Sequence, residues 1–600
     1  MRLLLVALLT TLASVLLAQT PITYTLDLTD INHHELGIEI DFPALGPAPL
    51  VVVMPTASPG RYAEHNFAKN VYNVRAQDGQ GREIAAARTG VNEWTVSGHG
   101  GAARFSYTLY ANRADGTYAK VDNRKLHLNM PAIFAYGRDM ADRPIELVIP
   151  ADQRPEWKVA TQLQRVGPRR FRAPDYYYFY DSPTMVGDIR YRSWTVPGAG
   201  RTDTIEMAFL CPDTEGQLDS FADWTKSIVE QERRVYGELP AFDYGRYTFL
   251  CAYNPYVSGD GMEHRNSTVC SSSSTLVEAA EGLIGTVAHE FFHCWNVERI
   301  RPASLEPFDF DRANQSGELW FAEGFTSYYD DLSLVRAGVL TPEDYVDNLT
   351  GQLNYVLLRP GREYRNPIEM SRCAPFVDAA TSIDPNNFAN TFVSYYPYGA
   401  TVGLGLDLLL RRDHSTTLDR LMQRMWTDYG KTEVPYEIPD IQRALAETIG
   451  DSTAAARYFE QYVYDSQLPD LKMLFADYGI GWEVERPDSV GFFGLRTRNS
   501  EDGLRVVGTV YRNNPLYAAG LESDDIILAI DGKEVTDRDA FDTLIGGLRI
   551  GKQYAMRYRQ NGIEQEGRFT AAADPSFKLV WQADVKKKVG ERRKAWLGVE

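Results

Sequence analysis

Cysteine, long apolar runs and basic residues are all scarce in this chain of 600 residues. Five cysteines exclude the disulfide scaffold of a small secreted module; one or two bridges stay open, and at least one thiol is left unpaired. Beyond the apolar run that ends at Leu17, no stretch reaches the roughly eighteen apolar residues of a transmembrane helix. We therefore expect no integral membrane segment. The cysteines are Cys211, Cys251, Cys270, Cys294 and Cys373.

Positive charge is the minority sign. The chain has 62 lysines and arginines against 81 aspartates and glutamates, a formal net charge of −19. Such a surface repels nucleic acid and anionic membranes, and it mildly attracts cationic peptide N-termini. The concentrated basic residues are Lys586–Lys588 and Arg592–Lys594, near the C-terminus, where we expect a solvated terminal element.

Residues 1–18 have the pattern of a secretory signal peptide. Arg2 precedes an apolar run from Leu3 to Leu17, and the small Ala18 marks the expected cleavage site. The new N-terminus would not be a cysteine, which argues against a lipoprotein anchor. We expect a secreted or periplasmic protein.

An HExxH motif lies between Val287 and Trp295 and consists of His289, Glu290 and His293. Residues four apart on a helix lie one above the other, so both imidazoles can face one ion. Glu290 can then take a proton from a water molecule without being a ligand. Because zinc lowers the pKa of such a water from 15.7 toward about 7, the motif predicts a zinc peptidase.

An isolated HExxH match also fits a packed helix whose two histidines are hydrogen-bonded in the core. Glu323 favours the metal, because two histidines, one glutamate and a water complete a catalytic zinc shell. It lies in a second helix-like, aromatic-rich run, 318–335. Cys294 points about 100° away from His293 on a helix, so we assign it to the core. We expect one zinc ion per chain, bound by His289, His293 and Glu323.

Glu263 is a candidate anchor for the free amine of a substrate. The segment 247–253 alternates like a strand, and the glycine-rich residues 259–264 after it predict a turn. A carboxylate beside the cleft that binds no metal would pair with a protonated N-terminus and fix where cutting occurs. The alternative is an ordinary turn that carries a solvated glutamate.

Tyrosines open a strongly apolar helical pattern downstream, in the segment 394–410. A hydroxyl there could hydrogen-bond the oxyanion that forms as water attacks the scissile carbonyl. We select Tyr396 for this role and keep Tyr395 as the second candidate. The alternative is that both are packed aromatics with their tips at the surface.

Several further segments accompany these residues. They are Gly261–His264, His289–Asn296, Arg299–Pro302 with Pro307–Asp309, and Leu319–Tyr329. Together they resemble the secreted glycyl aminopeptidase family and, more distantly, the aminopeptidase N family. The long segment between His293 and Glu323 favours the first family. Ser58–Tyr62 is similar to that family's N-terminal domain, and the C-terminal region is similar to its PDZ module.

The resemblance implies a gluzincin metallopeptidase that removes small N-terminal residues such as glycine. It assigns the zinc ligands to His289, His293 and Glu323, the general base to Glu290, the amine anchor to Glu263 and the oxyanion donor to Tyr396.

Changes in periodicity divide the chain into a multidomain α+β arrangement. The expected parts are a signal peptide (1–18), an N-terminal β-sandwich-like domain (19–195), a thermolysin-like catalytic domain with a helical half (196–478), a PDZ-like β domain (479–575) and a C-terminal tail (576–600). Nothing in the N-terminal domain looks catalytic, and we expect it to cover one side of the cleft. In the PDZ-like domain, Gly491–Leu495 would cradle a peptide carboxylate before an exposed strand edge, although a purely structural or autoinhibitory use stays open.

The pattern as a whole predicts a zinc aminopeptidase that acts on peptides. Two alternatives stay open: a secreted zinc endopeptidase, and a noncatalytic PDZ-containing protein that binds peptides. Expected partners are peptide substrates and a peptide ligand of the PDZ-like domain.

Overall fold

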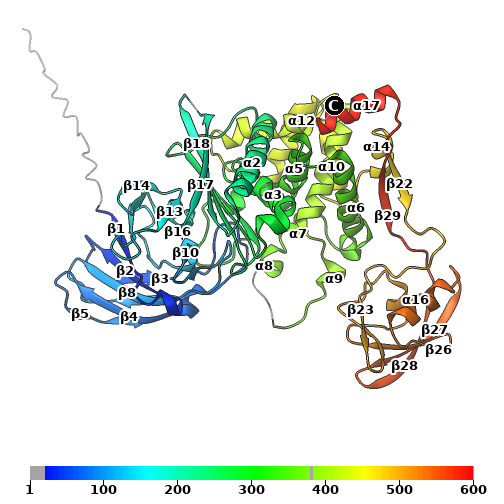
Figure 1. The fold of residues 1–600 in the computed structure, drawn as a ribbon, viewed down its shortest axis with the longest axis horizontal. Helices are drawn as coiled ribbons and strands as arrows, with labels where there is room; N and C mark the ends of the chain where they lie inside the picture. Colours follow the sequence, from blue (N-terminus) through cyan, green and yellow to red (C-terminus); the bar gives the residue numbers. More distant parts are fainter. Residues whose placement is uncertain (1–19, 199, 379–382, 599–600) are drawn as a thin grey trace, which may run out of the picture.

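The computed structural model describes residues 20–598 except residue 199 and residues 379–382. It consists of a β-rich N-terminal part, a middle part dominated by helices and a smaller β-rich part near the C-terminus (Figure 1). The multidomain α+β architecture predicted from the sequence is confirmed. The predicted signal peptide lies outside the described residues.

The N-terminal part consists of three sheets around one core. Its strands are β1 Ile22–Asp27, β2 Glu35–Phe42, β3 Leu50–Val53, β4 Val71–Asp78, β5 Glu83–Ile84, β6 Ala86–Arg88, β7 Glu93–Val96, β8 Ala103–Tyr110, β9 Lys120–Val121, β10 Lys125–Leu128, β11 Tyr136–Gly137, β12 Ile145–Val148, β13 Lys158–Thr161, β14 Gln164–Gly167, β15 Arg170–Ala173 and β16 Thr184–Gly187. The sheet orders are β14-β15-β12-β1-β2-β8-β4-β5, β13-β16-β10-β9 and β11-β3-β7-β6. Buried and accessible residues alternate along β1, β2 and β8, because one face of each strand lies on the core.

A five-stranded sheet forms the base of the middle part. Its strands, in spatial order, are β17 Arg190–Pro197, β18 Thr202–Leu210, β19 Arg246–Tyr253, β21 Ser267–Ser272 and β20 Asp260–His264. The three central strands are parallel, and β17 and β20 run antiparallel at the edges. The expected domain boundary after residue 195 falls inside β17.

The turn predicted at residues 259–264 is wrong for most of its length, because residues 260–264 form the edge strand β20. Pairing with β21 satisfies backbone groups on one side of this strand, and Thr268 adds a side-chain hydrogen bond of 2.8 Å to the carbonyl of Met262. Glycine at 259 and 261 concealed the strand, since glycine is depleted in strands.

Helices cover this sheet and extend away from it (Figure 1). They are α2 Glu215–Tyr236, α3 Leu276–Phe292, α4 Leu319–Ala322, α5 Gly324–Arg336, α6 Pro342–Leu358, α7 Pro367–Ser371, α8 Ala374–Val377, α9 Phe388–Thr391, α10 Tyr395–Asp413, α11 Leu418–Met425, α12 Ile438–Ile449, α13 Ser452–Tyr462 and α14 Leu471–Ala476. Helix α3 contacts β20, β21, α2 and α5, and α10 contacts α4 and α5. Among the described residues, no helix combines the length and apolar character needed to cross a bilayer.

The C-terminal β-rich part lies between two strands that belong to the middle part. Strands β22 (Ile480–Val484) and β29 (Phe577–Trp581) pair with each other, and β29 contacts α6. Between them a sheet has the order β23-β24-β25-β27-β28, so that β23 and β28 lie at the two ends of this order. Its elements are β23 Thr497–Ser500, β24 Gly503–Val506, α15 Pro515–Ala518, β25 Ile526–Ile530, β26 Lys533–Glu534, α16 Arg538–Gly546, β27 Gln553–Gln560 and β28 Ile563–Thr570.

The solvated terminal element expected from the basic residues is wrong in part: Lys586–Lys588 and Lys594 are exposed, but the helix that carries them packs against the middle part. Helix α17 (Lys587–Leu597) buries Trp596 completely, and its indole donates a hydrogen bond of 2.9 Å to Tyr328 in α5. Arg593 is also buried, with its guanidinium bonded to the carbonyls of Tyr478, Gly479 and Gln582. The helix carries apolar residues on one side, and the count of basic residues concealed them.

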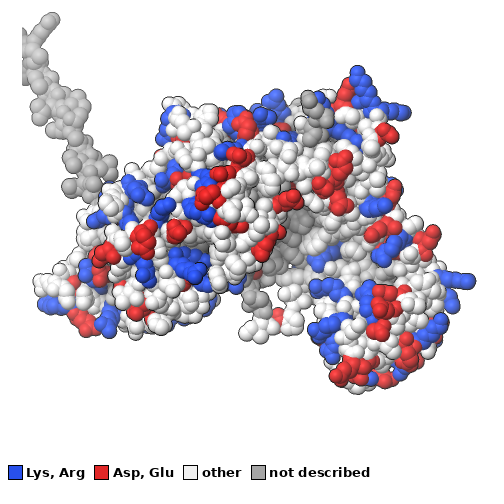
Figure 2. All heavy atoms as spheres, viewed as in Figure 1, with Lys and Arg blue, Asp and Glu red and all other residues white. Residues whose placement is uncertain are grey.

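Over the face in Figure 2, acidic and basic side chains are interspersed.

Candidate active site

The two histidines of the HExxH motif lie at the C-terminal end of α3. The helix spans Leu276–Phe292, so His289 occupies its last turn and His293 follows it directly. Their ring centroids are 4.7 Å apart. The apolar residues between and before them pack into the core, which orients both rings away from it and toward α5.

Glu323 joins the histidines from the junction between α4 and α5. Its Oε2 lies 3.5 Å from Nε2 of His289 and 3.3 Å from Nε2 of His293. Corners of a tetrahedron with bonds of about 2.0–2.1 Å lie about 3.3–3.4 Å apart, so the two distances from Glu323 are close to those of a tetrahedral zinc shell. The set of two imidazoles and one carboxylate could hold a metal ion.

The electrostatics of the cluster also suit a cation. Burial alone would lower the pKa of His293, but the carboxylates of Glu263 and Glu323 raise it to about 9. Burial alone would raise the pKa of Glu323, yet the neighbouring imidazoles hold it well below its ordinary range. The carboxylates thus stabilise positive charge at the imidazoles, where a cation would lie.

Each of the three groups has a second contact on the side away from the cluster. Nδ1 of His289 is 2.9 Å from Oδ2 of Asp330, and Nδ1 of His293 is 2.6 Å from the carbonyl oxygen of Asn296. Such partners fix the ring orientation and the tautomer of metal-binding histidines. On Glu323, Oε1 accepts a hydrogen bond of 2.8 Å from the hydroxyl of Tyr62.

Glu290 faces the backbone of β20. A Cβ atom placed on Gly261 would lie 2.0 Å from Oε1 of Glu290, so the carboxylate occupies space that only glycine leaves free. Burial raises the pKa of Glu290 to about 7, and the two imidazoles act in the opposite direction. Within the described part of the chain, its Oε2 makes no hydrogen bond.

Glu263 lies on the same edge strand, beside the cluster. Carboxylate atoms of Glu263 and Glu290 and a ring nitrogen of His293 all lie within 4.8 Å of one another. Glu263 is 7% exposed, and burial raises its pKa. The edge strand thus positions both Glu263 and the backbone against which Glu290 packs.

The two candidate tyrosines lie in the first turn of α10, which begins at Tyr395. The ring of Tyr396 lies 6.0 Å from that of His289 and is partly exposed. Tyr395 is buried and lies 6.4 Å from the ring of Tyr62. Tyr396 is therefore the accessible tyrosine beside His289, and Tyr395 is packed near Tyr62.

The N-terminal domain, in which nothing looked catalytic from the sequence, also contacts the candidate site. Its segment Ser58–Tyr62, hereafter the 58–62 loop, contributes Arg61 and Tyr62 to the site. Arg61 forms an ion pair with Asp260 at the start of β20. The segment 58–62 was recognised in the sequence only as part of the family resemblance. Its role could not be inferred there, because it depends on contacts between domains.

A cleft of about 820 Å³ borders the site. Its lining includes Arg61, Asp260 and Phe392, which adjoin the residues described above, and Tyr355 and Arg359 from the end of α6. The cleft thus has walls from both the N-terminal and the middle parts of the chain.

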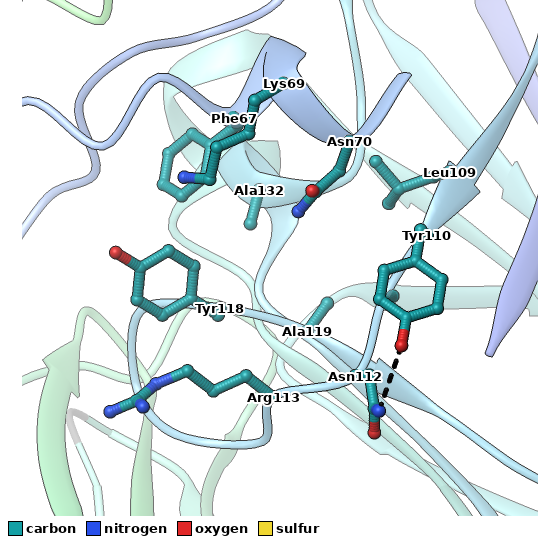
Figure 3. A pocket seen from close by; sticks show the side chains of 11 residues that line it. Phe67, Lys69, Asn70, Leu109, Tyr110, Asn112, Arg113, Tyr118, Ala119 and Ala132 are labelled. Carbon is teal, nitrogen blue, oxygen red and sulfur yellow. Dashed lines mark hydrogen bonds between the residues drawn. The ribbon is translucent and has the colours of Figure 1, made fainter. Parts of the chain in front are cut away.

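A second hollow, of about 440 Å³, lies in the N-terminal part (Figure 3). Lys69 and Arg113 line it together with the rings of Tyr110 and Tyr118, and Tyr110 accepts a hydrogen bond from Asn112. None of the six predicted site residues lines this hollow. It is a feature separate from the His–Glu cluster.

Comparisons with known proteins agree with this arrangement. Family models match residues 23–188 as the Peptidase M61 N-terminal domain, residues 282–402 as M61 glycyl aminopeptidase and residues 491–568 as a PDZ domain. No curated protein matches the sequence.

Two solved structures illustrate the likeness. A crystal structure of an aminopeptidase N family protein from Idiomarina loihiensis aligns over 96% of this chain and 100% of its own, with 23% identity and a TM-score of 0.80. A structure of Legionella pneumophila aminopeptidase A in complex with aspartic acid aligns over 95% of this chain and 60% of its own, with 11% identity and a TM-score of 0.43. Only the first likeness bears on the fold. The family resemblance inferred from the motifs is therefore confirmed: the chain matches the models of the M61 N-terminal domain, the M61 glycyl aminopeptidase and a PDZ domain.

Proposed function

We propose that this protein is a zinc-dependent aminopeptidase that removes N-terminal residues, small ones such as glycine, from peptides. One zinc ion per chain would be held by His289, His293 and Glu323. The tetrahedral spacing of their facing atoms, at 3.3 and 3.5 Å, supports this ligand set. When bound, the ion would supply Lewis acidity that acidifies a water molecule and polarises a peptide carbonyl.

The remaining residues then have distinct tasks. Glu290 would accept a proton from the attacking water and pass it to the leaving amine, and its pKa of about 7 suits both transfers. Tyr396 would donate a hydrogen bond to the carbonyl oxygen as negative charge develops there. Its ring beside His289, partly open to solvent, supports this choice over Tyr395.

The observation that carries the assignment as an exopeptidase is the lack of a lysine or arginine partner for Glu263 among the described residues. Glu263 is buried, and no lysine or arginine of the described residues forms a salt bridge with it. With the imidazole of His293 bound to the metal, this buried carboxylate would have no cationic side chain as a partner, and a substrate α-ammonium group would supply one. An endopeptidase would need no such anchor. A noncatalytic peptide-binding protein would have no use for Glu290 beside the three ligand residues.

The proposal also includes the export of the protein and the boundaries of its domains. The pattern of residues 1–18 supports a signal peptide and a secreted or periplasmic protein. The family matches, at 23–188, 282–402 and 491–568, each fall inside one of the proposed parts 19–195, 196–478 and 479–575, and we propose the PDZ domain as a site for a peptide ligand.

Replacing Glu263 with Gln tests the exopeptidase. With aminoacyl fluorogenic amides, we expect kcat/KM to fall by about 10²-fold or more, because an ion pair with the substrate amine is lost. The same amides with acetylated N-termini should be cut neither by the wild type nor by the variant. Zinc removal by a chelator should abolish the wild-type activity, and added zinc should restore it. Cutting of acetylated substrates by the wild type would instead indicate an endopeptidase.

A further inference from the structure

The 58–62 loop reaches from the N-terminal domain into the candidate active site and is tied on both sides. The guanidinium of Arg61 pairs with Asp260, and its Nε donates a hydrogen bond of 2.7 Å to Thr117. The backbone amide of Tyr62 donates to Oδ2 of Asp378 at 2.7 Å. The loop thus joins its own domain to two segments of the middle part.

The loop also fits closely against β20. Gly60 has a φ of +73°, and a Cβ atom there would lie 2.1 Å from Sδ of Met262 and 3.0 Å from Oε2 of Glu263. Glycine is therefore required at this position, both for the backbone conformation and for the close approach. Because it is held in this way, the loop can place the next side chains with little freedom.

Tyr62 extends from this loop to the carboxylate of Glu323. Its side chain is almost fully buried, and its hydroxyl donates to Oε1 of Glu323 at 2.8 Å. The other oxygen, Oε2, is the one that faces His289 and His293. The two oxygens of this carboxylate therefore have different partners.

We propose that Tyr62 is a positioning residue that restricts Glu323 to binding the metal through one oxygen. A carboxylate with two free oxygens can chelate an ion and occupy two of its positions. With Oε1 engaged by Tyr62, Glu323 would supply one ligand atom, and a coordination position would be left for water. The inference rests on the proposed zinc site, and it makes the N-terminal domain a functional part of that site.

The substitution Tyr62→Phe removes the hydroxyl and keeps the ring. We expect the zinc dissociation constant of the full-length protein, measured by competition with a chelator, to rise about 10- to 100-fold, as for other residues that orient metal ligands. The matched control is Tyr180→Phe, a buried tyrosine of the same domain whose hydroxyl donates to the carbonyl of Phe134 at 2.9 Å. It loses the same kind of hydrogen bond and should bind zinc as the wild type does.

A second measurement reports the coordination number directly. With Co²⁺ in place of zinc, four-coordinate sites absorb visible light more strongly than five-coordinate ones, so Tyr62→Phe should show a weaker band than the wild type or Tyr180→Phe. Circular dichroism and apo-protein melting verify that the variants fold.

The two proposals fail in different ways. Equal zinc affinity and equal cobalt spectra for Tyr62→Phe and the wild type would overturn the role of Tyr62. A wild type that binds no zinc would overturn the proposed function itself.

Discussion

At the residue scale, the histidines of the candidate site are fixed by hydrogen-bonding partners, whereas Glu290 is not. Asp330 and the carbonyl of Asn296 fix the histidine rings, so both Nε2 atoms face Glu323. Glu290 has an oxygen without a hydrogen bond among the described residues, although it is buried. A carboxylate of this kind can take up and release a proton near neutral pH, as a general base must.

The substitution Glu290→Gln tests this role. We expect kcat to fall by about 10²- to 10⁴-fold, because the amide accepts no proton, while zinc binding is retained since Glu290 is not a ligand. Activity on aminoacyl amides and zinc content by atomic absorption measure the two properties. Glu281→Gln, at an exposed position of the same helix, serves as the control and should keep wild-type activity. Retention of near-wild-type activity by Glu290→Gln would contradict the mechanism.

At the scale of elements, a pair of glycines sets the distance between two helices of the site. A Cβ atom on Gly324 would lie 2.4 Å from Cα of Gly399, and one on Gly399 would lie 2.0 Å from the carbonyl oxygen of Trp320. Gly324 follows Glu323 directly, and Gly399 lies one turn beyond Tyr396. The close contact of α5 with α10 therefore brings the carboxylate and the tyrosine together.

The substitution Gly399→Ala should force these helices apart. We expect a loss of about 1–3 kcal/mol in the free energy of unfolding and a lower kcat, because Tyr396 moves with α10. Gly351→Ala, within α6, is the matched control, since no atom lies within 4 Å of the position that its added methyl group would take. It should stabilise the protein by about 0.5–1 kcal/mol through helix propensity. Denaturant unfolding measures both, and equal stability of the two variants would refute the steric argument.

At the scale of the whole molecule, the PDZ domain docks beside the cleft. The hydroxyl of Tyr511 accepts hydrogen bonds from Nε and Nη2 of Arg359 at 3.0 and 2.7 Å. Arg359 also donates to the hydroxyl of Tyr355, which accepts from the backbone amide of Ser394, just before α10. On the PDZ side, the ring of Phe493 lies 5.9 Å from that of Tyr511. A chain of contacts thus connects the loop Gly491–Leu495, expected to bind a peptide carboxylate, with the start of α10.

Removing the hydroxyl of Tyr511 should loosen this docking. For Tyr511→Phe we expect about tenfold faster amide hydrogen exchange in residues 388–396, because a charge-assisted hydrogen bond contributes about 1.5–3 kcal/mol before solvent weakens it. Exchange in the hairpin of β27 and β28, inside the domain, should not change. The control is Tyr517→Phe, since that ring is 39% exposed. Unchanged exchange in residues 388–396 would show that this contact does not hold the domain in place.

Much of the arrangement was predictable from the sequence where the pattern is local. The HExxH spacing predicted the adjacent imidazoles, because helical geometry relates residues four apart regardless of the rest of the fold. The strands of the N-terminal and PDZ parts followed from alternation and turn residues. Local patterns misled at residues 259–264, where glycines hid an edge strand, and at α17, where basic residues hid an apolar face.

The order of amino acids alone indicated the family and the candidate donor atoms, since both follow from the identity and spacing of the motif residues. Only the tertiary structure decided that the N-terminal domain contributes a residue to the candidate site. The contact of Tyr62 with Glu323 joins residues 261 positions apart, and no period of a helix or strand relates positions so distant. Such a contact forms only when separate cores pack together, because the packing of whole domains brings the two side chains within hydrogen-bonding distance.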